Sequence, residues 1–368
     1  MTMVQHRHLD EMTPWNDRLH MLEVVGVVDE APAVKTFIFR SPDGCWFRYK
    51  PGQFVTLELP VGDGEPLFRT YTLASSPSRP YCVAVTVKAQ EGSVGTRWMF
   101  DHLRPGMRIK AYGPNGHFTH VDHPAGRYLF ISAGSGITPM MAMLRWMADL
   151  APQSDVAFVS CARSPRDIIF RHELELLDRQ MPNLSLSVMV KGNSLGESWF
   201  GHRGQISHPM LAMLVPDLME REVFCCGPEA FMALVQDFLR DAGFDMAHYH
   251  QESFGEAAAD APAEQVAIVT EAGAEAGAAS DGAIPVVFAN WGVTGSCQPG
   301  QTVLEAARAA GVRIPAACES GICGTCKTRK ISGEVVMTHN GGILDEEVEE
   351  GYILACCSRP LGPLELDA

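Results

Sequence analysis

The sequence predicts a multidomain chain in which an antiparallel β-barrel precedes a doubly wound α/β domain and a small α+β unit. Three observations support this order. Short β-type runs with Gly and Pro turns fill residues 20–122, and strand-like runs alternate with helix-like runs in residues 123–254. A low-complexity stretch, residues 255–283, separates them from a compact remainder, residues 284–368. Residues 1–19 are expected to form an N-terminal tail.

Five runs are the expected strands of the first domain, and turns such as Pro51-Gly52 and Pro105-Gly106 separate them. The runs are Val24–Val28, Val34–Phe39, Phe54–Leu59, Tyr81–Lys88 and Met107–Ala111. Many short strands with this punctuation are typical of an antiparallel barrel.

The second domain alternates between the two types of element. A buried-type strand at Tyr128–Ser132 leads through a Gly-rich turn to a helical stretch at Pro139–Leu150. The strand Val156–Cys161, a helix near Phe170–Gln180 and the strand Leu184–Val190 follow. This alternation indicates a parallel, doubly wound sheet.

Residues 255–283 are rich in Ala, Gly and Glu and contain six acidic and no basic residues, so we expect a flexible acidic linker. In the unit that follows, apolar runs at Val286–Phe288 and Tyr352–Cys356 flank a helical segment at Val303–Ala310. This pattern is consistent with a small α+β domain.

The formal net charge is −15, which argues against nucleic acid as a partner and favours a basic protein partner. The N-terminal residues contain no apolar signal-peptide core, and no run of about 18 apolar residues predicts a membrane span. Eleven cysteines without a secretory signal indicate metal ligation in a reducing compartment. We therefore expect a cytoplasmic protein that does not bind membranes.

Four cysteines have the spacing of a plant-type [2Fe–2S] site. Cys318, Cys323 and Cys326 follow the pattern C-x4-C-x2-C, and Cys356 lies on a distant segment. Gly321 and Gly324 lack a Cβ, which lets backbone N–H groups approach the sulfurs. These four cysteines are the expected cluster ligands.

A structural zinc site is the alternative, but zinc sites usually contain two separate C-x2-C pairs and this region has one. Cys357 is expected to be a bystander beside Cys356, although an exchange of ligands between the two stays open. Cys45, Cys82, Cys161 and Cys297 are expected to be small buried residues.

The segment Phe68–Ser75 contains the R-x-Y-[ST] pattern of ferredoxin–NADP reductase-type flavin domains. Arg69 can hold the flavin diphosphate by charge-assisted hydrogen bonds. Tyr71 can lie against the isoalloxazine ring, and Thr72 can hydrogen-bond toward flavin N5. The expected flavin is FAD rather than FMN.

A second flavin segment is expected at residues 92–96, where Gly92, Ser93, Val94 and Thr96 would bring backbone N–H groups to the pyrophosphate. Relatives often have Ser where Gly95 stands, so the hydroxyl of Ser93 or Thr96 would have to replace that contact. A barrel with ordinary turns is the alternative interpretation.

A Gly-rich turn after the strand Tyr128–Ser132 predicts a pyridine nucleotide site. Gly134 and Gly136 would let the pyrophosphate approach the backbone, Thr138 would be the N-cap, and Pro139 would open the helix. This turn would form the phosphate half of the site.

The nicotinamide half is expected where Cys226, Gly227 and Pro228 follow a strand at Glu222–Cys225, at the carboxyl edge of the sheet. Cys226 would lie beside nicotinamide C4, where a pocket-shaping role without covalent chemistry is the alternative. Phe254 would shield the flavin, or would instead be a core or linker-anchoring residue.

The choice between NADH and NADPH rests on the turn after the second strand of this domain. Arg163, Ser164 and Arg166 could receive a 2′-phosphate, whereas Asp167 would suit a free ribose hydroxyl. Arginines on a solvated turn are common, so NADH is favoured and NADPH stays open.

These motifs, in this order, resemble the reductase components of multicomponent oxygenases, with a flavin barrel, a nucleotide domain and a C-terminal β-grasp ferredoxin domain. The chain is similar to the reductases of glycine betaine monooxygenase and stachydrine demethylase systems. The similarity covers nearly all of the chain after about residue 20, apart from the linker. The stretches that carry it are Phe54–Leu59, Ala162–Ile169, Arg221–Pro228, His339–Ile343 and Glu350–Leu354.

The resemblance implies FAD, NADH and a Rieske-type terminal oxygenase as electron acceptor, which would demethylate a quaternary ammonium compound. The nucleotide would deliver a hydride to the flavin, with Thr72 and Cys226 at the reacting atoms, and the cluster would pass on single electrons. The acidic linker would let the ferredoxin domain alternate between the flavin and its partner.

Other interpretations stay open at this point. The acceptor could be a hybrid-cluster protein, or a phenol or phenylacetyl-CoA oxygenase, because such reductases share these motifs. A redox sensor without turnover is a different class of function, against which the intact nucleotide motifs argue.

Overall fold

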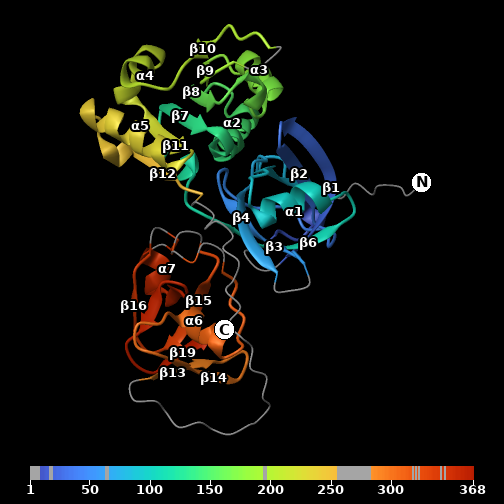
Figure 1. Cartoon of the computed structure of the whole chain (residues 1–368), viewed down its shortest axis with the longest axis vertical. Helices are drawn as coiled ribbons and strands as arrows, with labels where there is room; N and C mark the ends of the chain where they lie inside the picture. The colour runs from blue at the N-terminus through green and yellow to red at the C-terminus, as the bar shows by residue number, and fades with distance from the viewer. Residues whose placement is uncertain are drawn as a thin grey trace. The chain divides into compact units, whose positions relative to one another are not determined.

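The computed structural model describes residues 9–15, 20–62, 66–193, 197–254, 283–316, 319, 321, 324–339, 342–343 and 345–368. Two compact units make up the chain, and Figure 1 shows the elements of each. The first contains strands β1–β12, apart from Phe68–Thr70 of β4, and the second contains strands β13–β19. Among the described residues, every helix is too short or too polar to cross a bilayer.

The first six strands form one antiparallel sheet in the order β4-β3-β6-β1-β2-β5. The strands are β1 (His20–Ala31), β2 (Val34–Arg40), β3 (Phe54–Leu59), β4 (Leu67–Thr72), β5 (Val83–Lys88) and β6 (Arg108–Asn115), and helix α1 spans Val94–His102. An antiparallel bridge between Leu73 and Val85 joins the end of β4 to β5, so the two edges of the sheet meet. The interior is apolar, with Phe37, Phe39 and Leu57 fully buried. The predicted barrel is confirmed.

The next six strands form a wholly parallel sheet in the order β10-β9-β8-β7-β11-β12. The strands are β7 (Arg127–Ala133), β8 (Asp155–Ala162), β9 (Leu184–Val190), β10 (His202–Arg203), β11 (Glu222–Cys226) and β12 (Tyr249–Glu252). The helices are α2 (Ile137–Leu150), α3 (Arg171–Gln180), α4 (His208–Leu214) and α5 (Glu229–Asp241). Because the strand order runs outward from β7 in both directions, a crevice is expected at the carboxyl ends next to β7.

Side-chain alternation divides the apolar residues of this sheet between two helical layers. Phe130 and Phe224 pack in one core with residues of α2 and α3. Ile131 and Val223 pack in the other core with residues of α4 and α5. Strands buried on both faces are typical of parallel sheets, so the doubly wound prediction is also confirmed.

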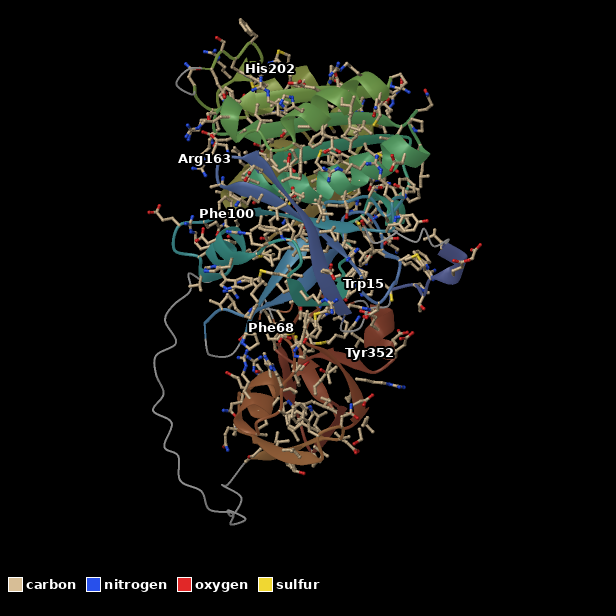
Figure 2. The ribbon with its side chains drawn as sticks, turned by 90° about the vertical axis from the view of Figure 1, so that its right-hand side faces the viewer. Trp15, Phe68, Phe100, Arg163, His202 and Tyr352 are labelled. Carbon is tan, nitrogen blue, oxygen red and sulfur yellow. The ribbon has the colours of Figure 1, made fainter. Side chains whose placement is uncertain are left out.

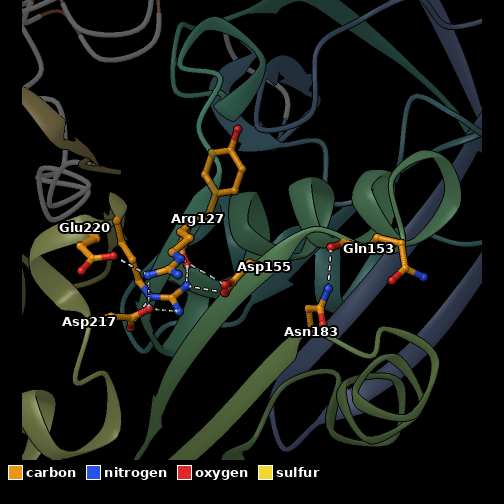
Figure 3. A network of polar contacts seen from close by, with 8 residues as sticks. Arg127, Gln153, Asp155, Asn183, Asp217 and Glu220 are labelled. Carbon is orange, nitrogen blue, oxygen red and sulfur yellow. Dashed lines mark hydrogen bonds and ion pairs between the residues drawn. The ribbon is translucent and has the colours of Figure 1, made fainter.

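Arginines and carboxylates form a network at the amino ends of three of these parallel strands, in which Figure 3 labels Arg127, Asp155, Asp217 and Glu220. Arg221 precedes β11 and is 8% exposed. Its guanidinium donates to the Tyr128 carbonyl at 3.0 Å, to Asp155 at 2.8 Å and to Asp217 at 2.7 Å and 2.8 Å. Arg127 adds ion pairs to the same carboxylates, at 3.5 Å for Asp155 and 3.3 Å for Asp217. Each of these hydrogen bonds therefore pairs the buried positive charge of Arg221 with a carboxylate or a carbonyl oxygen.

Arg145 connects the barrel to the parallel domain within the first unit. This α2 residue donates to the carbonyl of Ala74, just beyond β4, and pairs with Glu173 of α3 at 2.5 Å. Its guanidinium also lies over the Phe170 ring, 4.6 Å from the centroid. A second contact joins the barrel to the parallel domain. Arg79, between β4 and β5, pairs with Asp149 of α2 at 2.7 Å.

The second unit is an α+β fold in which a five-stranded mixed sheet has the order β14-β13-β19-β15-β17. Its elements are β13 (Ile284–Phe288), β14 (Val293–Cys297), α6 (Val303–Ala309), β15 (Lys327–Ser332), α7 (Asp345–Glu349), β17 (Tyr352–Leu354) and β19 (Leu364–Asp367), with β16 (Val335–Met337) and β18 (Ser358–Pro360) paired separately. Helix α6 packs its buried face on the sheet, and a capping box of Thr302 and Glu305 begins it. The predicted β-grasp class is confirmed.

Short 3₁₀ turns complete the described chain. They are η1 (Leu9–Glu11), η2 (His120–Asp122), η3 (Gly134–Gly136), η4 (Pro165–Asp167), η5 (Leu218–Glu220) and η6 (Met246–His248). The predicted tail includes η1, whereas nearly all of the predicted linker lies outside the described residues.

Candidate functional site

Strand β4 carries the three residues of the predicted flavin motif. Arg69 is half-buried and donates one hydrogen bond to the carbonyl of Phe68 at 2.9 Å. Arg69 and Tyr71 are two residues apart, so they share one face of the strand. Thr72 ends the strand and is 6% exposed, and its hydroxyl has no hydrogen-bond partner among the described residues. Buried hydroxyls in proteins are normally hydrogen-bonded, so this one suits a bound polar ligand.

The second flavin segment forms the amino end of α1. Ser93 is the N-cap and its hydroxyl oxygen accepts a hydrogen bond from the backbone N–H of Thr96 at 3.4 Å. The hydroxyl oxygen of Thr96 accepts from the backbone N–H of Gln90 at 3.1 Å. Gly92 has a φ of +82°, which favours glycine, and Val94 is the first residue of the helix. The free N–H groups of such a first turn attract an anionic phosphate.

Three residues lie in register at the carboxyl ends of neighbouring strands of the parallel sheet, with Ser132 next to last in β7 and with Cys226 and Glu252 last in β11 and β12. Ser132 of β7 pairs with Cys226 of β11, and Cys226 pairs with Glu252 of β12. Residues in register on parallel strands point to the same face, so the three side chains form one row at the carboxyl edge. Neither the Ser132 hydroxyl nor Glu252 Oε2 has a hydrogen-bond partner among the described residues, although both atoms are buried. This row is where the topology expects a nicotinamide.

Burial makes the two acids of this row weak. The side chain of Cys226 is completely buried, and desolvation together with the nearby Glu252 raises the pKa of its thiol well above the usual range. The thiol is therefore neutral, which favours the pocket-shaping role and gives no support to covalent chemistry. Burial also raises the pKa of Glu252 to about 8, so this carboxyl can hold a proton near neutral pH.

The Gly-rich turn uses its two glycines differently. Gly134 has a φ of +56°, and a Cβ on it would meet no atom within 4 Å, so its surroundings are open to a ligand. A Cβ on Gly136 would lie 2.2 Å from the carbonyl oxygen of Cys226 and 2.6 Å from the nitrogen of Gly227. The absent side chain of Gly136 thus allows this turn to pack against the turn after β11.

Two details of the predicted helix start are wrong. Helix α2 begins at Ile137 and its N-cap is Gly136, so Thr138 lies inside the first turn rather than at the cap. The Thr138 hydroxyl donates to the carbonyl of Ser135 at 3.0 Å, which stabilises the η3 turn instead. Pro139 is consequently the third helical residue, where its missing N–H costs no intrahelical hydrogen bond.

The remaining predicted nucleotide residues lie after β11, after β12 and in the turn after β8. Gly227 packs closely on Phe231 and Ala133, and Pro228 is the N-cap of α5. Phe254 is 44% exposed, which excludes the core alternative. Arg163 follows β8 and is exposed (Figure 2). Asp167 accepts a hydrogen bond from the Ser164 hydroxyl at 2.5 Å, which positions its carboxylate.

The second unit brings two of the four predicted cluster ligands together. Cys326 and Cys356 are 2% and 7% exposed, and the backbone N–H of Cys356 donates to the sulfur of Cys326 at 3.5 Å. The carbonyl of Cys326 also accepts from the N–H of Ala355 at 3.1 Å. Cys318 and Cys323 lie outside the described residues. Two buried thiols, one of which accepts a hydrogen bond from a backbone N–H group, fit an iron–sulfur site.

Two glycines of the cysteine loop have left-handed backbone conformations. Gly321 has a φ of +72° and Gly324 a φ of +68°. A Cβ on Gly324 would lie 2.7 Å from the carbonyl oxygen of Gly342, so another residue would push these segments apart. Cys357, next to the predicted fourth ligand, directs its sulfur toward the carbonyl of Leu354 at 3.7 Å.

Sequence reasoning did not assign Ser132 or Glu252 to the site. A signal for Glu252 was present, because the segment His250–Phe254 ends the predicted nucleotide domain, but the role there was predicted for Phe254. Ser132 could not be identified, since it was one more residue in a buried-type strand until the register placed it beside Cys226.

Three domain families match the chain in the predicted order. Residues 22–120 match the oxidoreductase FAD-binding domain, residues 130–237 the oxidoreductase NAD-binding domain and residues 289–361 the 2Fe-2S iron-sulfur cluster binding domain. FAD, a nicotinamide nucleotide and a [2Fe–2S] cluster are therefore the cofactors of this chain, and the domain set and relatives identify the nucleotide as NADH.

The chain is similar to characterised reductases along nearly its whole length. It is 50% identical to the stachydrine N-demethylase reductase subunit of Rhizobium meliloti, over 97% of this chain and 99% of the relative. It is 45% identical to the glycine betaine monooxygenase reductase subunit of Pseudomonas aeruginosa, over 96% of each. Among solved structures, phthalate dioxygenase reductase has the same fold, with a TM-score of 0.57 at 24% identity over 97% of this chain and 100% of that one. The chain thus belongs to the family of NADH-dependent flavin and [2Fe–2S] reductase subunits that serve multicomponent monooxygenases.

Proposed function

We propose that this chain passes electrons from NADH to a Rieske-type terminal oxygenase that demethylates a quaternary ammonium compound, such as stachydrine or glycine betaine. The observation that carries the proposal is the 50% and 45% identity, across all three domains, to the reductase subunits of stachydrine N-demethylase and glycine betaine monooxygenase. The reductase itself does not need to bind the methylated substrate.

On the flavin side, we assign binding to three parts of the barrel. Arg69 holds the diphosphate, Tyr71 covers the ring, and the first turn of α1 with Gly92, Ser93, Val94 and Thr96 binds phosphate. The buried, unpartnered hydroxyl of Thr72 supports its assignment to the reactive edge of the flavin. A hydroxyl that already lies at this edge can hydrogen-bond the flavin ring and orient it without rearrangement of the protein.

On the nucleotide side, we assign the pyrophosphate to the turn at Gly134 and the nicotinamide to the row Ser132, Cys226 and Glu252. The unpartnered oxygens of Ser132 and Glu252 suit a carboxamide, which offers both a donor and an acceptor. The small side chain of Cys226 leaves room for the nicotinamide ring, and Gly227 has no side chain to obstruct it. The exposed Phe254 can cover the site.

The electrons leave through the second unit, where we assign Cys318, Cys323, Cys326 and Cys356 as ligands of the cluster. When bound, FAD supplies the conversion of a hydride into single electrons and the [2Fe–2S] cluster supplies a one-electron carrier. Buried thiolates with N–H donors tune such a carrier, as the hydrogen bond from Cys356 N to Cys326 Sγ illustrates.

The test is reconstitution with purified Rieske oxygenases. The holoprotein, NADH and an oxygenase are combined with stachydrine, glycine betaine or carnitine, and formaldehyde release is measured. We expect NADH-dependent formaldehyde from one of these pairs, and none without the reductase. Efficient reduction of a phenol oxygenase or a hybrid-cluster protein, with no formaldehyde from any of the three substrates, would contradict the proposed partner while leaving the reductase chemistry intact.

A further inference from the structure

Two histidines and a glutamate converge on the α2-facing side of the parallel sheet, away from the cofactor residues. One ligand atom from each of His123, Glu222 and His250 lies within 4.8 Å of the other two. His250 Nε2 is 2.5 Å from Glu222 Oε1. The rings of His123 and His250 are 3.7 Å apart between centroids, with 30° between their planes. The convergence is not local in sequence, since three separate segments provide the residues.

We propose that His123, Glu222 and His250 form a binding site for one divalent transition-metal ion of the zinc type. Two imidazoles and one carboxylate are a recurrent ligand set for such ions, with a fourth position left for water. Zinc–nitrogen bonds of about 2.0–2.1 Å and tetrahedral angles require donor atoms about 3.3 Å apart. The three donor atoms lie within 4.8 Å of one another, and His250 Nε2 hydrogen-bonds Glu222 Oε1 at 2.5 Å, so an ion would replace this hydrogen bond.

The residues around His123, Glu222 and His250 position these side chains as residues around metal ligands do. Glu222 Oε2 accepts from His248 Nδ1 at 2.8 Å, so the carboxylate is oriented by a third histidine that does not need to touch the ion. The completely buried ring of Phe224 lies beneath both imidazoles, 4.9 Å from His250 and 6.1 Å from His123. The His123 ring contacts that the structure shows are with the rings of Phe224 and His250, and an ion would give its imidazole nitrogen a polar partner.

The position of the site indicates what an ion would do. His123 lies on the connection between β6 and β7, which leads from the barrel into the parallel domain. Glu222 begins β11 and His250 lies in β12. One ion would therefore fasten the interdomain connection to the sheet. Cys226 ends β11 four residues after Glu222, about 13 Å along a strand, so the ion would lie outside the path of the hydride.

A structural hydrogen-bond network is the competing explanation, in which Glu222 serves only to join His248 and His250. The two explanations differ in their response to added metal. The network needs no ion, whereas a metal site gains stability in proportion to the logarithm of the free ion concentration. Metal binding also requires at least two of His123, Glu222 and His250 at the same time. A hydrogen bond to Glu222 requires only one histidine.

The experiment uses the full-length holoprotein with flavin and cluster loaded, dialysed against a chelator and checked for unchanged visible absorbance. Zinc is added in one equivalent, and its content, affinity and X-ray absorption fine structure are measured. We expect one zinc per chain with nitrogen and oxygen neighbours at about 2.0–2.1 Å and no sulfur at about 2.3 Å. We also expect a higher melting temperature of the first unit. Sulfur neighbours, or no uptake, would overturn the proposal.

Variants separate the ligands from their surroundings. His123→Gln, Glu222→Gln and His250→Gln should each weaken zinc affinity at least 100-fold, and His248→Gln about tenfold, as expected for a residue that orients a ligand. His172→Gln is the matched control, because His172 is an exposed histidine on α3 of the same domain. If one ligand variant fails to fold, the X-ray absorption spectrum of the zinc-loaded wild-type protein still shows whether nitrogen and oxygen or sulfur bind the ion. Equal zinc affinity in His172→Gln and all three ligand variants would overturn the proposal.

Discussion

Glu252 on β12 lies in register with Cys226 on β11, and the two residues end neighbouring parallel strands. The pairing places a buried carboxyl beside a buried thiol at the edge where the nucleotide is expected. It connects the fold to the proposed chemistry, because the register of three strands brings Ser132, Cys226 and Glu252 into one row.

Replacing Glu252 tests this wall. In Glu252→Gln we expect flavin reduction by NADH to slow by about tenfold or more, because the substitution retains the shape of the side chain and changes the carboxyl proposed to hold the nicotinamide. Anaerobic stopped-flow absorbance measures the rate. Glu175→Gln, a change at an exposed position of α3, is the control and should leave it unchanged. Equal rates in the two variants would remove Glu252 from the site.

Gly136 should tolerate no side chain. In Gly136→Ala the new Cβ meets backbone atoms of Cys226 and Gly227, so we expect a loss of about 1–3 kcal/mol in the free energy of unfolding and weaker NADH binding. Gly126→Ala is the control, since nothing lies within 4 Å of its Cβ position. Denaturant titration and NADH titration measure the two effects. If both variants behaved like the wild type, the close packing of the two turns would be wrong.

His120 should make the first unit sensitive to acid. Its buried ring contacts Tyr128 and Trp146, and desolvation lowers the pKa of His120 from 6.5 to about 4. Between these pH values the unfolded chain binds a proton that the folded chain does not, so stability falls as pH drops from 6.5 toward 4. The full loss is about 3 kcal/mol at about 1.4 kcal/mol for each unit of the pKa shift.

The measurement for His120 is the melting temperature of the first unit, followed by flavin fluorescence between pH 7 and pH 4.5. His120→Phe should flatten the pH dependence relative to the wild type, and His172→Gln should not. Parallel curves for all three proteins would show that His120 does not contribute to acid sensitivity.

Cys326→Ser should remove the cluster and leave the flavin in place. We expect loss of NADH-dependent cytochrome c reduction, while NADH–ferricyanide activity is largely retained, because the serine oxygen replaces a thiolate ligand only poorly. The control is Cys357→Ser, which changes the neighbour of Cys356 and should retain cluster absorbance. If Cys357→Ser lost the cluster and Cys356→Ser kept it, the fourth ligand would be Cys357.

Sequence patterns predicted those features that local chemistry determines. Gly and Pro punctuation indicated the barrel, and the strand β3 was predicted residue for residue as Phe54–Leu59. The cysteine spacing and the strand–turn–helix at Gly134 indicated the two cofactor regions. Thr138 was misplaced because the η3 turn occupies the three residues before α2, and a local capping pattern does not reveal such a turn.

Features that depend on pairing between distant segments could not be predicted. The row of Ser132, Cys226 and Glu252 exists only because three strands align in register. The group of His123, Glu222 and His250 likewise comes from three segments, and each residue alone is an ordinary polar side chain. Burial that raises the pKa of Glu252 arises from the same tertiary packing.

The most direct test of the central claim is anaerobic mixing of the holoprotein with NADH, with absorbance and rapid-freeze electron paramagnetic resonance recorded together. The account predicts that flavin absorbance bleaches first and that the signal of a reduced [2Fe–2S] cluster then appears. In Cys326→Ser only the first phase should remain. A cluster that is reduced before the flavin, or a flavin that NADH fails to bleach, would contradict the account.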